Sequence, residues 1–127
     1  MSRNYKINDQ EKAYFVTFTV INWIDVFIRN EYRTIFMDSL KFCQEHKGLK
    51  IYAWCLMTSH AHLIVSTDGK NPLQGIIRDT KSFTSRHIRK LLEDKNAVGE
   101  SRREWMYNMM QNAGLNNRNN NNFQFWQ

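Results

Sequence analysis

Residues 49–67 read LKIYAWCLMTSHAHLIVST and contain two apolar, β-branched stretches, 49–58 and 60–67, around a short polar break. The second stretch ends at Asp68-Gly69, which is a common turn signal. Runs of this length and composition are typical of strands. The segment therefore predicts two neighbouring strands joined by a tight turn.

The sequence before this hairpin predicts a strand and a helix. Residues 14–28, YFVTFTVINWIDVFI, are dense in β-branched and aromatic side chains. We expect a strand there, with the part from Trp23 onward forming either its extension or a turn. In residues 31–47 apolar side chains recur at spacings of three and four, which predicts an amphipathic helix.

The sequence after the hairpin predicts two more helices. Asn71-Pro72 is a typical helix start, and an apolar stripe follows it to about Lys95. Residues 100–111, ESRREWMYNMMQ, are a third helical candidate because Trp105 and three methionines cluster at helical spacing.

The C-terminal part changes character twice. Residues 112–122 contain seven Asn and predict a flexible loop. Residues 123–127, FQFWQ, then resume an aromatic pattern. Exposed alternating aromatics would form an adhesive apolar patch. We therefore expect this segment to pair with a sheet edge, or the chain to continue in a longer parent protein.

The order strand, helix, strand, strand, helix predicts the fold. It is that of an α+β, ferredoxin-like split βαβ sandwich, with an antiparallel sheet and helices on one face. We expect one domain over residues 1–127, with its core in 12–95, and an open sheet face available for a ligand.

Composition narrows the functional classes. The chain is 42% hydrophobic and 13% aromatic, which excludes a disordered protein, and it has no apolar run of membrane-spanning length. We expect a cytoplasmic protein, because no signal or transit segment is recognisable at its start. Cys43 and Cys55 are far apart in apolar surroundings, which favours buried thiols. The net charge of +6 is compatible with a nucleic-acid partner without requiring one.

The polar feature of the hairpin is the pair His60 and His62. Side chains two positions apart in a strand lie on the same face, roughly 7 Å apart along it. Two imidazoles placed in this way can converge on one divalent ion. Taken alone, the pattern is equally compatible with rings that satisfy local hydrogen bonds.

The wider context resembles a known family. The string Tyr52-Ala-Trp-Cys-Leu-Met-Thr-Ser-His60-Ala-His62-Leu-Ile-Val is similar to the signature of the single-tyrosine HUH transposases, and most similar to their REP-associated branch. The resemblance extends to YFVTFTV, to Arg29 and Arg33, to the basic helix after Pro72 and to the terminal Phe-Trp-Gln.

This resemblance implies an activity. Members of the family cleave and rejoin single-stranded DNA through a 5′-phosphotyrosine. Two histidines of such relatives hold a divalent ion that polarises the scissile phosphate. The resemblance therefore implies that His60 and His62 are metal ligands. Imidazole with oxygen ligands suits Mn²⁺ or Mg²⁺. The implied partner is single-stranded or hairpin DNA, with a homodimer as one possible state.

The chain departs from the family pattern at two places. Thr58-Ser59 stands where relatives have Pro-Asn, which changes the turn but keeps the spacing. The nucleophilic tyrosine and third ligand of relatives lie on a helix after Phe-Trp-Gln. We expect that helix to lie beyond Gln127, which leaves the activity of these 127 residues open. Tyr107 is a weaker candidate, because its neighbours resemble packing residues.

The helix after Pro72 also carries candidate DNA-binding residues. Basic and hydroxyl side chains recur along it at spacings that favour a stripe, which could follow a phosphate backbone or be a solvated helix face. The candidates are Arg78, Lys81, Ser82, Arg86, Arg89 and Lys90.

Two other functions compete with the transposase. The first is a non-catalytic single-stranded nucleic-acid-binding module on the same fold, in which exposed aromatics stack bases. Trp23 and Trp54 could serve it, although the pattern favours core positions for both. The second is a histidine-triad phosphohydrolase, which we exclude because position 64 is Ile.

Overall fold

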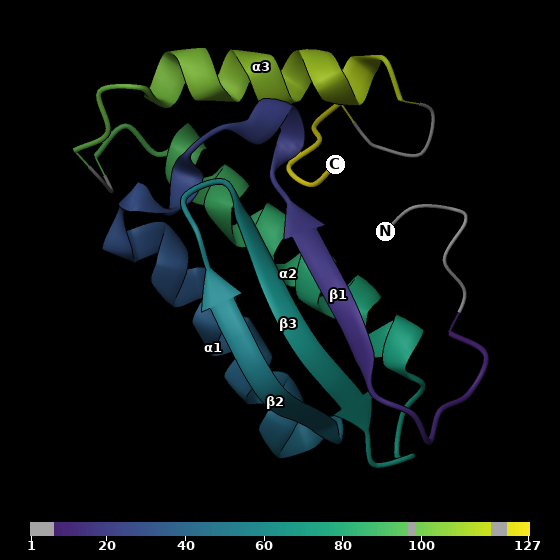
Figure 1. The fold of residues 1–127 in the computed structure, drawn as a ribbon. Helices are drawn as coiled ribbons and strands as arrows, with labels where there is room; N and C mark the ends of the chain where they lie inside the picture. Colours follow the sequence, from purple (N-terminus) through teal and green to yellow (C-terminus); the bar gives the residue numbers. More distant parts are fainter. Residues whose placement is uncertain (1–6, 97–98, 118–121) are drawn as a thin grey trace.

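The computed structural model describes residues 7–96, 99–117 and 122–127. Its central layer is a three-stranded antiparallel sheet of β1 (Tyr14–Thr19), β2 (Leu49–Leu56) and β3 (His60–Thr67) in the order β1-β3-β2 (Figure 1). The predicted hairpin is confirmed, and its turn is closed by the Met57 amide, which donates to the His60 carbonyl at 2.8 Å. The sheet order and the connections are those of the predicted α+β fold.

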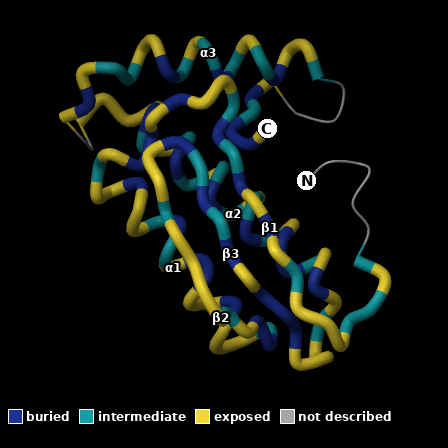
Figure 2. The backbone as a smooth tube through the Cα atoms, in the orientation of Figure 1, coloured by how far each residue is buried: buried dark blue, intermediate teal, exposed yellow. Residues whose placement is uncertain are grey.

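Two long helices cover one face of the sheet. α1 (Asn30–His46) and α2 (Leu73–Glu93) both lie behind the strands in Figure 1 and pack against each other. Both fall within two residues of their predicted bounds. Alternate residues of β1 and β3 point toward these helices, so Val16, Phe18 and Leu63 are buried in the core. This alternation is visible in Figure 2, where β2 at the edge is mostly exposed.

Among the residues that the structure describes, no helix covers the opposite face of the sheet. We call it the open face and define it by Phe15, Thr17, His60, His62 and Ile64, which alternate with the buried positions. The prediction of an open face is therefore confirmed for the described residues.

The segment after β1 is a turn and does not extend the strand. Two short 3₁₀ helices follow, η1 (Ile21–Trp23) and η2 (Val26–Ile28). Asn22 and Trp23 have φ of 54° and 55°, a left-handed conformation that ends extended backbone and is uncommon outside glycine. The turn is held to the hairpin, because the Val20 amide donates to the Ser59 carbonyl and the Phe27 amide to that of Thr58.

The third helix is shifted along the chain from its predicted bounds of 100–111, because it begins three residues later and ends four residues later. α3 (Arg103–Leu115) lies across the end of the sheet at which β3 begins (Figure 1). The prediction of loop from residue 112 was therefore wrong for its first four residues, because Gly114 packs directly on the backbone of Phe123 and anchors the last helical turn. Residues 118–121 of the predicted loop lie outside the described residues.

The C-terminal segment returns to the sheet. Trp126 forms an isolated antiparallel bridge with Val20, next to β1, and the Gln127 amide donates to the Thr19 carbonyl at 2.7 Å. The Trp126 ring packs on Phe18 and Phe36 in the core. Of the two expectations for this segment, pairing with the sheet edge is thus confirmed.

No helix among the described residues has the length and apolarity needed to cross a bilayer.

Candidate functional site

The two histidines of the sequence motif lie together on the open face. His62 pairs with Thr17 and His60 with Thr19 in the β1–β3 register, and the two imidazole centroids are 4.8 Å apart. Both side chains are half-buried at the end of the sheet that α3 crosses. The period of two in β3 therefore produces the predicted juxtaposition. We call these two residues the histidine pair.

Each imidazole is oriented by a hydroxyl group. The Nδ1 atom of His60 lies 3.1 Å from Ser59 Oγ, and that of His62 lies 3.0 Å from Thr17 Oγ1. Within the described part of the chain, neither Nε2 atom has a hydrogen-bond partner. When the hydroxyl oxygen accepts from Nδ1–H, Nε2 carries the lone pair that a metal ion requires.

Sequence reasoning missed both orienting hydroxyls. Ser59 was recognised only as a departure from the family pattern, yet it supplies the contact to His60. Thr17 could have been found from the strand pairing, because a residue opposite a histidine in an antiparallel sheet lies within side-chain reach.

Among the described residues, the two histidines are candidate metal ligands, and no third candidate is placed with them. No group of three or more His, Cys, Asp or Glu side chains within them is arranged to hold an ion. Cys55 pairs with His62 in the β2–β3 register and is exposed, so its predicted burial was wrong, while Cys43 is buried as expected. Cys55 is exposed because it lies beside His62 on the open face, in the edge strand β2.

Two tryptophans expected in the core are at the surface. Trp23 is exposed beside His60, because the left-handed turn carries it to the open-face side. Trp54 is exposed at the edge strand, beside Arg33 and Met37 of α1.

The basic residues of α2 do not lie with the histidine pair, because α2 covers the opposite face of the sheet (Figure 1). They also divide into two groups. Lys81 and Arg89 lie toward β1 and the C-terminal segment, where they sit over the Phe18 and Phe123 rings. Ser82 and Arg86 line a groove of about 570 Å³ against α1.

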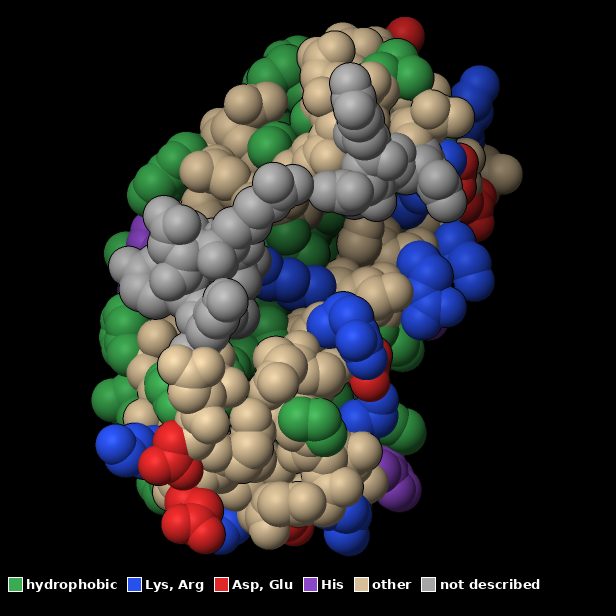
Figure 3. All heavy atoms as spheres, turned by 90° about the vertical axis from the view of Figure 1, so that its right-hand side faces the viewer, with side chains coloured by type: hydrophobic (Ala, Val, Ile, Leu, Met, Phe, Trp, Pro, Cys, Tyr) green, Lys and Arg blue, Asp and Glu red, His purple; other side chains and the backbone are tan. Residues whose placement is uncertain are grey.

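One side of the molecule carries a basic surface. Figure 3 shows Lys and Arg side chains gathered on the side of the molecule that carries β1 and the C-terminal segment. The charge of Arg89 is reduced by Glu93, with which it pairs at 3.5 Å. Arg78 pairs at 3.7 Å with Asp79, which lines the groove against α1. Lys90 is exposed.

The tyrosine hydroxyls of the described residues are bound away from the histidine pair. Tyr107 donates to Glu93 Oε2 at 2.9 Å and packs on Phe123, which agrees with its interpretation as a packing residue. Tyr52 is bonded to Ser66, Tyr14 to the Asp9 carbonyl and Tyr32 to Glu100.

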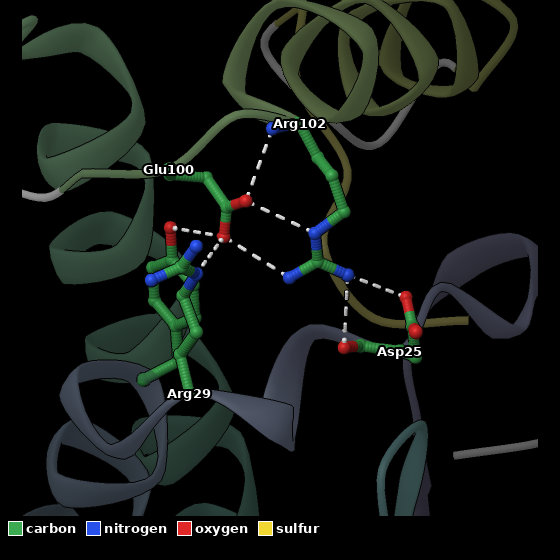
Figure 4. Close-up of polar contacts among 5 residues, drawn as sticks. Asp25, Arg29, Glu100 and Arg102 are labelled. Carbon is green, nitrogen blue, oxygen red and sulfur yellow. Dashed lines mark hydrogen bonds and ion pairs between the residues drawn. The ribbon is translucent and has the colours of Figure 1, made fainter.

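A buried carboxylate, Glu100, lies next to α3, and no pattern in the sequence indicates it. Glu100 lies 2.9 Å from Arg29 Nε and 3.0 Å from Arg102 Nε, and Arg102 also reaches Asp25 (Figure 4). Arg29 immediately precedes α1 and Arg102 immediately precedes α3. The cluster therefore joins the beginnings of two helices.

The charges of this cluster perturb two pKa values. Burial alone would raise the pKa of Glu100, but the hydrogen bonds and charge of Arg102, with the charge of Arg29, lower it to about 2. Burial, followed by the negative charge of Glu100, raises the pKa of Tyr32 to about 12. Glu100 is therefore ionised and Tyr32 neutral at physiological pH.

Two solved structures share the fold. A REP-associated tyrosine transposase bound to a REP hairpin matches with a TM-score of 0.56 and 18% identity, over 76% of this chain and 56% of that one. A transposase of Deinococcus radiodurans R1, described as putative, matches with a TM-score of 0.53 and 17% identity, over 78% of this chain and 75% of that one. The chain thus spans little more than half of the first protein.

Sequence comparison gives the family. No curated protein sequence matches significantly. The family described as "Transposase IS200 like" matches residues 11–111, which include the whole sheet, α1, α2 and most of α3. The histidine pair lies inside this match. By its sequence and fold, the chain belongs to the IS200-like transposase family.

Proposed function

We propose that this chain is the DNA-processing domain of a single-tyrosine transposase, acting in the metal-dependent cleavage and rejoining of single-stranded DNA. The observation that carries the proposal is the histidine pair on the open face, with each Nδ1 oriented by a hydroxyl. Membership in the IS200-like family supports it. A REP hairpin is bound to one protein of the same fold, which favours hairpin DNA as the partner here.

The histidine pair would hold the divalent ion through the two Nε2 atoms. An Mn²⁺ or Mg²⁺ ion supplies a Lewis acid for a non-bridging oxygen of the scissile phosphate. In the reaction we propose, a tyrosine oxygen attacks phosphorus and the 3′ oxygen of the preceding nucleotide leaves with a proton. The phosphotyrosine ester conserves the energy of the broken bond for rejoining.

The tyrosine hydroxyls of the described residues are engaged elsewhere, so we assign none of them as the nucleophile. The role of this domain in the reaction is to bind and orient the phosphate. Ser59 and Thr17 act as positioning residues, because they fix the rings of the ligands.

Calorimetry with Mn²⁺ tests the proposal. We expect His60→Ala/His62→Ala to abolish Mn²⁺ binding, and a control with the other two histidines changed, His46→Ala/His87→Ala, to retain it. His87 bonds to the Phe83 carbonyl and His46 lies on the far end of α1, so neither faces the histidine pair. Equal Mn²⁺ binding by the two double variants would refute the metal site.

We also propose that the DNA backbone contacts the basic side of α2. A DNA strand bound at the histidine pair would have to pass the edge of β1 to reach Lys81 and Arg89. A path around this edge suits a folded DNA such as a hairpin. Lys81→Ala/Arg89→Ala should weaken hairpin binding and lower the slope of log K against log salt by about one for each lost phosphate contact. A control pair of exposed lysines, Lys12→Ala/Lys41→Ala, should leave that slope unchanged.

A non-catalytic single-stranded nucleic-acid binder is the second candidate. It is favoured by the absence of a third metal ligand among the described residues. Its distinguishing outcome is oligonucleotide binding that is unaffected by Mn²⁺ and by His60→Ala/His62→Ala.

A further inference from the structure

Two exposed aromatic rings flank the histidine pair. The Phe15 ring is stacked on His62, with centroids 5.4 Å apart and an interplanar angle of 18°. The Trp23 ring meets His60 edge-on at 5.1 Å. With the 4.8 Å contact between the imidazoles, four rings follow one another in the order Trp23, His60, His62, Phe15. Phe15 is 67% exposed and Trp23 60%.

The position of Trp23 is maintained against a backbone preference. Asn22 and Trp23 are both left-handed, which is unfavourable for residues with a β-carbon and tends to occur at functional sites. Hydrogen bonds from Val20 and Phe27 to the hairpin turn hold the segment in place. The fold therefore presents a large apolar ring to solvent at a fixed place, next to a proposed metal ligand.

The chemistry of the neighbouring site identifies a ligand for these rings. A phosphate held at the histidine pair has one nucleoside on each side of it. Single-stranded bases have free faces, and exposed aromatic rings are the side chains on which such bases stack, whatever the base. Both rings are exposed and no helix of the described segments covers them, so a base can reach either ring.

We propose that Trp23 and Phe15 form a two-base subsite, on which the nucleobases on either side of the bound phosphate stack. This inference rests on the proposed function, because it uses the phosphate position at the histidine pair. It adds a binding determinant that accepts single-stranded DNA and excludes a paired duplex, whose base faces are already stacked.

Affinity measurements with leucine variants test the role of the rings. Leucine keeps apolar bulk but removes the π face. Phe15→Leu and Trp23→Leu should each weaken binding of a thymidine hexanucleotide by roughly 5- to 150-fold, the usual range for one stacked base. Phe42→Leu and Trp105→Leu are matched controls, since these rings are also about half exposed but lie on α1 and α3. Phe15→Tyr and Trp23→Phe should retain most of the affinity.

Nuclear magnetic resonance of the indole N–H groups identifies the ring that is contacted. Adding the hexanucleotide should shift the Trp23 signal and leave those of Trp54 and Trp105 in place. An abasic hexanucleotide of the same length should give no such shift. The inference is overturned if the abasic strand binds equally well, or if the leucine variants match their controls.

The same spectra test separately whether the histidine pair binds a metal ion. Bound Mn²⁺ is paramagnetic and should broaden the signals of nearby indoles, that of Trp23 most strongly because its ring contacts His60, and His60→Ala/His62→Ala should remove that effect. Histidine-dependent broadening without a base-dependent shift refutes the two-base subsite and leaves the metal site standing. A base-dependent shift without Mn²⁺ broadening refutes the metal site, and with it the assignment of the bases to the two sides of a bound phosphate.

Discussion

Neutralising Glu100 should remove a large part of the acid sensitivity of this domain. The Glu100 side chain is 1% exposed and lies between Arg29 and Arg102. Its pKa is lowered from 4.5 to about 2 in the folded protein. A carboxylate with a lowered pKa stabilises the fold above the unfolded value, and this contribution is lost as the pH falls through the folded value.

The size of the effect follows from that difference. A tenfold change in proton affinity corresponds to about 1.4 kcal/mol, so a pKa change from 4.5 to about 2 is linked to about 3 kcal/mol of stability. This contribution is complete near pH 6 and declines between about pH 5 and pH 2. Replacement by Gln also removes a charge facing two partly buried guanidinium groups, and we expect Glu100→Gln to cost about 3–5 kcal/mol at pH 7.

Urea denaturation followed by circular dichroism measures both quantities. The free energy of unfolding of the parent protein should fall by about 3 kcal/mol more than that of Glu100→Gln between pH 6 and pH 2. Glu45→Gln is the matched control, because Glu45 is exposed and, within the described ranges, its only ion pair is a 3.9 Å contact with His46. Parallel pH profiles for Glu100→Gln and the parent protein would refute the reasoning.

Two further predictions concern the helices. Gly114→Ala should destabilise the fold by about 2 kcal/mol or more, because a β-carbon there would lie 2.0 Å from the Phe123 backbone nitrogen. Gly75→Ala should stabilise the fold by about 0.5–1 kcal/mol, because alanine favours a helix and the atom nearest to the added β-carbon would be 3.7 Å away. Thermal unfolding of the two variants should therefore shift in opposite directions. Asp79→Asn should cost less than about 1 kcal/mol at pH 7, since the hydrogen bond from Lys47 lowers the pKa of Asp79 but the pair is partly exposed. A larger loss by calorimetry would contradict this reading of the α1–α2 ion pair.

Periodic elements were predictable from the sequence because each buries one face. The β2–β3 hairpin and helices α1 and α2 follow the apolar spacing closely, and the family resemblance agrees with the match over residues 11–111. The two histidines were brought to the same face by the period of the strand alone.

The predictions that were wrong depended on tertiary contacts, which local sequence patterns do not indicate. Trp54 and Cys55 are in an edge strand, and strand order is decided by tertiary pairing. Trp23 lies at the surface because Asn22 and Trp23 are left-handed, and the segment has no glycine that would indicate such a turn. The stripe on α2 was inferred from spacing, but its residues divide between two sides because β1 and α1 flank the helix. The Glu100 cluster joins residues more than 60 positions apart, which periodicity cannot indicate.

The return of Trp126 to Val20 has a consequence for the folding rate of this domain. The two residues are more than 100 positions apart, so their contact closes a long loop and costs more chain entropy than the hairpin does. We expect the local β2–β3 pairing to form before the rate-limiting barrier and the docking of residues 123–127 after it. Substitutions in that segment should then accelerate unfolding while leaving the folding rate nearly unchanged. The lifetime of the native state, more than the speed of reaching it, would depend on the last five residues.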